Sequence, residues 1–74
     1  DDMLFSALLA KLFADRQLSP APDVIQYLIT RLERSHAAAK RFVQIVDKAA
    51  LNEHKSITRA FVVKILAKIT PIAD

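Results

Sequence analysis

Glycine is the most informative absence in this chain of 74 residues, because the sequence contains none. Loops that cradle phosphate groups depend on glycine, whose missing side chain permits positive φ angles and a close approach of the backbone to the ligand. The composition therefore excludes a P-loop and a glycine-rich dinucleotide-binding motif from this chain.

Cysteine and long apolar runs are absent as well. Without cysteine the chain has no disulfide, no thiolate zinc site and no cysteine nucleophile, and this usage agrees with a reducing, cytoplasmic location. The charge-free stretch 3–10 is much shorter than the roughly 20 apolar residues that span a bilayer, and no cleavable signal pattern follows it. We expect no membrane partner.

The charge balance is mildly basic. Lysine and arginine number 11 against 8 aspartate and glutamate residues, which leaves a net charge of +3. A dedicated nucleic-acid arm carries more charge than this. We expect residues 1–74 to form a single small domain, which buries only about 60% of its unfolded surface. Because the sequence begins Asp1-Asp2-Met3, we also expect it to be a fragment of a longer protein.

Apolar residues recur at spacings of three and four, which predicts amphipathic helices rather than strands. In the first helix, Leu4 and Leu8 are expected beside Phe5 and Leu9 on one broad apolar face. The predicted fold class is all-α, a compact four-helix bundle. Its helices are expected at about residues 3–15, 22–33, 36–50 and 58–69.

The predicted helix boundaries rest on local signals. Prolines separate the first helix from the second, and Pro71 is expected to end the fourth. Ser35 and Thr58 are predicted N-caps, and Ile57 with Val62 forms a predicted hydrophobic staple. No glycine or proline separates the second helix from the third, so a near-continuous helix is an open alternative.

Residues of catalytic or metal-binding type show no arrangement that selects a site. His36 and His54 lie on different predicted elements, and neither has an acidic residue or a histidine four positions away. A zinc site needs more ligands than these two, so we expect no metal. The hydroxyls at helix starts are explained by capping. We expect no catalysis by this chain alone.

Basic residues gather in the stretch "TRLERSHAAAKRF" at 30–42. Arg34, Arg41 and Lys48 recur every seven residues, so they share one face if the helix is continuous, and Arg31 flanks them. Three interpretations are open: a solvated helix face, a site for a phosphate-bearing ligand or an acidic partner, and a surface that contacts nucleic-acid phosphates.

DNA binding is the least favoured of these interpretations. Glu33 and Asp47 interrupt the basic line, and no exposed aromatic residue interleaves with it for base stacking. A helix-turn-helix module with residues 55–68 as its recognition helix is the alternative function. The connection before that helix is longer than the tight turn that such a motif uses.

Three motifs follow one another in a recognisable order. They are Pro22-Asp23-Val24, then Arg31-Leu32, then Ile57-Thr58, Phe61-Val62 and Ile65-Leu66. With these motifs the chain resembles the helical lid subdomain of DnaA-type AAA+ ATPases, and most closely that of the DnaA-related regulators called Hda.

The resemblance implies a longer bacterial protein with an AAA+ base domain, which carries the Walker motifs and binds ATP or ADP. The lid would help to enclose the nucleotide and to contact neighbouring subunits, in a protein that regulates replication initiation by inactivating DnaA. Its implied partners are that base domain, DnaA and the polymerase sliding clamp. Whether the parent hydrolyses ATP stays open. Separated from its base, a lid exposes apolar surface, so we expect some self-association.

The resemblance also gives meaning to one alanine. Lids of this family carry a phosphate-sensing arginine, called sensor 2, near the start of the third helix, and that position falls on Ala37. The candidate nucleotide or partner contacts are therefore Arg34, Arg41 and Arg31. Either Arg34 or Arg41 replaces the sensor arginine, or nucleotide sensing through the lid is weakened.

Overall fold

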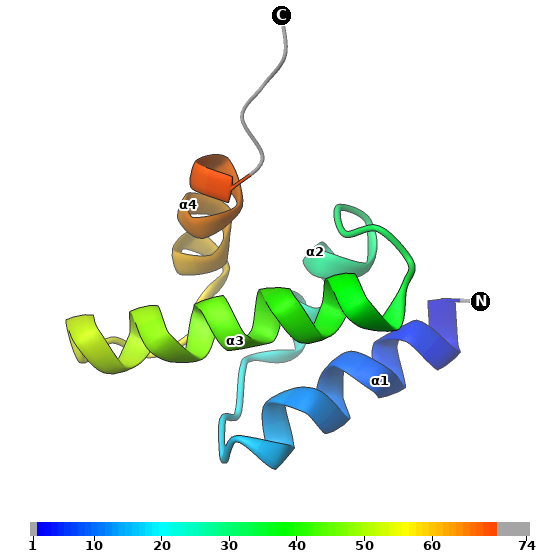
Figure 1. Ribbon diagram of the computed structural model, residues 1–74, viewed down its shortest axis with the longest axis horizontal. Helices are drawn as coiled ribbons and strands as arrows, with labels where there is room; N and C mark the ends of the chain where they lie inside the picture. Colours follow the sequence, from blue (N-terminus) through cyan, green and yellow to red (C-terminus); the bar gives the residue numbers. More distant parts are fainter. Residues whose placement is uncertain (1, 70–74) are drawn as a thin grey trace, which may run out of the picture.

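The computed structural model describes residues 2–69, which form four α-helices and no strand (Figure 1). The all-α class is confirmed, and the predicted stop at Pro71 lies outside the described residues. No described helix is both long and apolar enough to cross a membrane. The helices are α1 (Asp2–Asp15), α2 (Pro22–Ile29), α3 (His36–Glu53) and α4 (Arg59–Ile69).

The long helix α3 is the main axis of the domain. Helix α1 lies along it and runs in the same general direction, while α2 and α4 lie on the other side of α3 in this view (Figure 1). Helix α1 packs against both α2 and α3, and α2 packs against α4. Just after α1, the guanidinium of Arg16 pairs with the carboxylate of Asp47 on α3 at 2.8 Å, which fixes the end of α1 against α3.

The core is wholly apolar among the described residues, and it includes all four phenylalanines of the chain. Since no buried polar group needs a partner, its stability comes from apolar burial and packing. The buried side chains are Phe5, Leu9, Phe13, Val24, Leu28, Ala39, Phe42, Val43, Val46, Ala50, Ile57, Phe61, Val62 and Ile65.

The apolar face of α1 is narrower than predicted. Phe5, Leu9 and Phe13 are buried, but Leu4 is 71% exposed, so its placement on the core face was wrong. Each helical residue turns by about 100°, and Leu4 therefore points away from the stripe that begins at Phe5. Leu8 is half-buried at the edge of the core, because four further residues rotate its side chain back toward that stripe.

Helix α2 is shorter than the predicted range 22–33, and it does not merge with α3. The amide of Thr30 donates to the carbonyl of Tyr27 at 3.2 Å, and the Thr30 hydroxyl donates to the same oxygen at 2.7 Å. This bond spans three residues instead of four, which tightens the final turn and ends the helix at Ile29. Residues 30–35 form the loop to α3.

Both predicted N-caps are confirmed. The hydroxyl of Ser35 accepts a hydrogen bond from the Ala38 amide at 3.0 Å, at the start of α3. The hydroxyl of Thr58 accepts one from the Phe61 amide at 3.3 Å, at the start of α4. Each cap satisfies an amide that has no carbonyl partner within its helix.

Two helices end in a left-handed residue that is not glycine. At the end of α1, Gln17 has φ 60°, and its neighbour Leu18 donates a backbone hydrogen bond to Phe13 at 2.9 Å. Helix α3 continues beyond its predicted end at residue 50 and stops where His54 takes φ 54°. Glycine usually fills such positions, so its absence left the second stop without a signal in the sequence.

This backbone conformation predicts that glycine at either position stabilises the domain. We expect Gln17→Gly and His54→Gly each to raise the free energy of unfolding by about 0.5–1 kcal/mol, because relief of left-handed strain exceeds the added entropy of the unfolded chain. Urea unfolding followed by circular dichroism measures this. The control is Ala10→Gly inside α1, which should destabilise by about 1 kcal/mol. Destabilisation of the same size by His54→Gly would contradict the strain argument.

Candidate functional site

An open groove of about 600 Å³ lies between the loop 30–35, the first half of α3 and the end of α4. Its walls are apolar at Phe42 and Ile45 of α3 and at Leu66 of α4. Arginine side chains border it. We call this feature the α3 groove, and its charged lining residues are Arg31, Glu33 and Arg41.

Small side chains line the α3 groove at the start of α3. They are Ala37 and Ala38 of the first turn. The amides of this first turn lie at the positive end of the helix dipole, which favours negative charge. Arg31 and Arg41 add positive charge at this end of the groove, while Glu33 adds a negative charge and Ser35 already caps the Ala38 amide.

Two of the three candidate arginines border the α3 groove. Arg31 and Arg41 are exposed, and neither forms an ion pair with any carboxylate among residues 2–69. The Arg31 guanidinium lies 5.3 Å from the centre of the Tyr27 ring. The structure thus brings Arg31, Ala37 and Arg41 together around one groove, as their proximity in sequence suggested.

The third candidate, Arg34, lies elsewhere and has several partners. Its guanidinium forms an ion pair with Asp2 at the start of α1 and donates to the Ile29 carbonyl at 3.2 Å, at the end of α2. It also lies 5.8 Å from the centre of the Phe5 ring. Arg34 therefore joins α1, α2 and the loop before α3, which is a structural role.

The predicted line of basic residues is interrupted by the start of α3. Arg34 precedes the helix, so it does not share a helical face with Arg41 and Lys48. The carboxylate of Asp47, which interrupts the line further along, is paired with Arg16.

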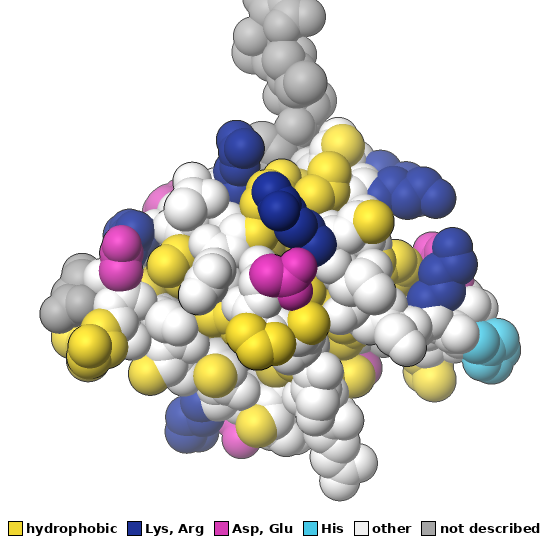
Figure 2. Space-filling model, turned by 180° about the vertical axis from the view of Figure 1, so that it is seen from behind, with side chains coloured by type: hydrophobic (Ala, Val, Ile, Leu, Met, Phe, Trp, Pro, Cys, Tyr) yellow, Lys and Arg dark blue, Asp and Glu magenta, His cyan; other side chains and the backbone are white. Residues whose placement is uncertain are grey.

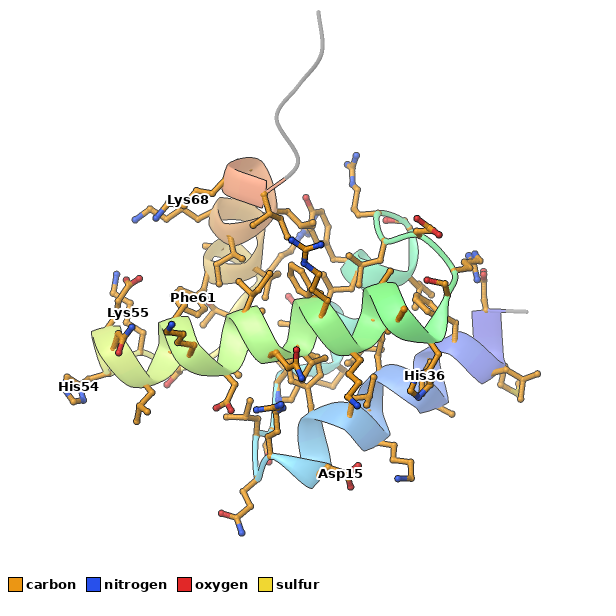
Figure 3. The ribbon with its side chains drawn as sticks, in the orientation of Figure 1. Asp15, His36, His54, Lys55, Phe61 and Lys68 are labelled. Atoms are coloured by element: carbon orange, nitrogen blue, oxygen red, sulfur yellow. The ribbon has the colours of Figure 1, made fainter. Side chains whose placement is uncertain are left out.

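The histidines and carboxylates of residues 2–69 form no second candidate site. His36 and His54 lie at opposite ends of α3 (Figure 3). Within residues 2–69, no three histidine, aspartate or glutamate side chains lie close enough together to hold a metal ion. The connection from α3 to α4 spans residues 54–58, and it is longer than the tight turn of a helix-turn-helix motif.

The contribution of α4 to this region has no local signal in the sequence. Leu66 closes the α3 groove from a distant part of the chain, and the Arg59 guanidinium lies 5.2 Å from the Tyr27 ring centre. No local spacing relates Arg59 to α2. Tyr27 and Arg31 are four residues apart in the chain, although Arg31 lies in the loop just after α2.

The described residues form a small helical domain with a groove bordered by arginines at the start of its third helix. Comparison with known families makes this specific. The model described as "Hda, lid domain" matches residues 2–66, so the chain belongs to the Hda lid domain family. The resemblance found in the sequence is confirmed. No curated protein and no solved structure gives a match to the chain.

The contacts of Arg34 predict that it contributes to the free energy of unfolding, whereas Arg41, which lacks such contacts, does not. We expect Arg34→Ala to lower the free energy of unfolding by about 1–2 kcal/mol, because it removes an ion pair, a hydrogen bond and a ring contact together. Arg41→Ala is the matched control and should change it by less than about 0.5 kcal/mol. Urea denaturation of both variants tests this. Equal effects would show that Arg34 does not hold these segments together.

Proposed function

We propose that this lid closes over a nucleotide held by the base domain of its parent AAA+ protein, with the α3 groove facing that nucleotide. The parent is a DnaA-related regulator that inactivates DnaA in the bacterial cytoplasm. The proposal rests on one observation, which is that Arg31, Ala37 and Arg41 all line the α3 groove. The lid has no catalytic residue of its own in this proposal, and the base domain supplies the Walker motifs.

Arg41 is the best candidate for a phosphate contact. It follows Ala37 by one helical turn, so the two residues lie on the same side of α3. It lies on the groove and has no ion-pair partner within residues 2–69. Arg34 is a weaker candidate, because a phosphate contact would require it to leave Asp2 and the Ile29 carbonyl.

Other surfaces of the lid suit contacts inside a larger assembly. At the start of α1, the consecutive apolar residues Met3 and Leu4 are 80% and 71% exposed. In the proposed parent, such residues pack against the base domain or a neighbouring AAA+ subunit. The isolated domain would self-associate through the same side chains. The sliding clamp and DnaA would bind the assembled protein.

A gain of function tests the nucleotide proposal. In the parent protein, we expect Ala37→Arg to tighten binding of ATP or ADP by roughly tenfold, which is the effect of one added hydrogen bond between charged groups. Arg41→Ala should weaken binding by a similar factor. Fluorescence titration with a labelled adenine nucleotide measures both changes.

Lys48→Ala is the control for this experiment, because Lys48 is an exposed cation on α3 that does not line the groove. It should leave nucleotide affinity within about twofold of the unaltered protein. If Ala37→Arg and Arg41→Ala also change the nucleotide affinity by less than about twofold, the α3 groove does not face the nucleotide.

A further inference from the structure

A second cationic feature lies between α2 and α4, centred on Tyr27. The guanidinium carbon of Arg31 lies 5.3 Å from the centre of the Tyr27 ring, and that of Arg59 lies 5.2 Å from it. Arg59 is the first residue of α4, so this aromatic ring joins two helices. Both arginines are exposed, whereas Tyr27 is half-buried against the core.

The two arginines lie at the same aromatic ring. Each gains about 0.5–1 kcal/mol from the electrons of an aromatic ring at an exposed site, but two like charges also repel each other. Neither forms an ion pair with a carboxylate of residues 2–69. Asp23, the acidic residue of α2, is one helical turn before Tyr27 and forms no ion pair with either. An external carboxylate would relieve this repulsion.

Apolar surface adjoins the two arginines. A shallow depression of about 340 Å³ is lined by Tyr27, Arg31, Val63 and the last turns of α4. Val63 is 40% exposed although it is a large apolar residue. Seen from behind, the molecule shows basic side chains, with acidic side chains among them, beside apolar side chains on the upper part of this face (Figure 2). Tyrosine and arginine beside apolar residues are typical of the centre of a protein interface.

We propose that the Tyr27 patch, which comprises Tyr27, Arg31, Arg59 and Val63, docks an acidic amphipathic segment of a partner protein. Carboxylates of that segment accept paired hydrogen bonds from the two guanidinium groups, and an apolar side chain packs on Val63. Arginine suits this task because its planar fork matches a carboxylate.

The chemistry of the patch favours protein over nucleic acid. Guanidinium groups already lie over the Tyr27 ring, so a base does not gain a free stacking surface there. The exposed Val63 offers nothing to a phosphate backbone, but it offers apolar contact to a leucine or isoleucine.

The Tyr27 patch lies partly outside the α3 groove, which is the surface proposed to face the nucleotide. The two proposals are therefore tested separately. The patch shares Arg31 with the α3 groove, but Arg59 and Val63 do not line that groove. Variants at these two positions therefore report on docking alone. Failure of docking leaves the nucleotide proposal standing, and the reverse also holds.

The experiment uses this chain labelled with nitrogen-15 and titrated with a synthetic amphipathic helical peptide. The peptide carries glutamate at spacings of four residues on one side and leucine on the other. We expect saturable shifts of the Tyr27, Arg59 and Val63 amide signals. Arg59→Ala and Val63→Glu should each weaken binding by at least about fivefold. Arg59→Lys keeps the charge but loses the fork, so it should weaken binding as well.

Lys64→Ala is the matched control, since it removes an exposed cation of the same helix that lies outside the patch. It should change the affinity by less than about twofold. A peptide with lysine in place of glutamate should not bind. The proposal is overturned if Lys64→Ala and Arg59→Ala weaken binding equally, if the shifts spread over all basic side chains, or if duplex DNA binds the patch more tightly than the peptide. Absence of saturable shifts overturns it as well.

Discussion

The position of the α3 groove depends on the contacts of Arg34. Its guanidinium holds the carboxylate of Asp2, the carbonyl of Ile29 and the ring of Phe5 at the same time. Those contacts connect the start of α1 and the end of α2 to the loop that enters α3. A single exposed ion pair contributes little to stability. A planar fork that contacts three segments instead fixes their relative geometry, and the loop 30–35 then sets where α3 begins.

The two termini of each helix were not equally predictable from the sequence. The starts of α3 and α4 were predictable, because a capping hydroxyl acts on an amide only three residues away, as Ser35 and Thr58 do. The ends were not. Thr30 closes α2 with its own hydroxyl, and His54 closes α3 in a conformation that normally signals itself through glycine. In a chain without glycine, the residues that end the helices cannot be recognised by the usual C-terminal glycine.

The candidate site divides in the same way into local and distant parts. The grouping of Arg31, Ala37 and Arg41 follows from their closeness in sequence, although the meaning of Ala37 came from family resemblance and not from spacing. The separation of Arg34 from that group depends on Asp2, a partner in another helix. Leu66 reaches the α3 groove from α4, and Arg59 reaches the Tyr27 ring from the same helix, so only packing of the whole domain places them.

The distribution of paired and unpaired charge connects the two proposed surfaces. Arg16 and Arg34 pair with carboxylates of α3 and α1, respectively. Arg31, Arg41 and Arg59 have no ion pair within residues 2–69, and they lie around the α3 groove and the Tyr27 patch. A domain with net charge +3 loses stability by keeping like charges together. Anionic groups from outside the domain remove that repulsion, and these two surfaces are where the lid is suited to receive them.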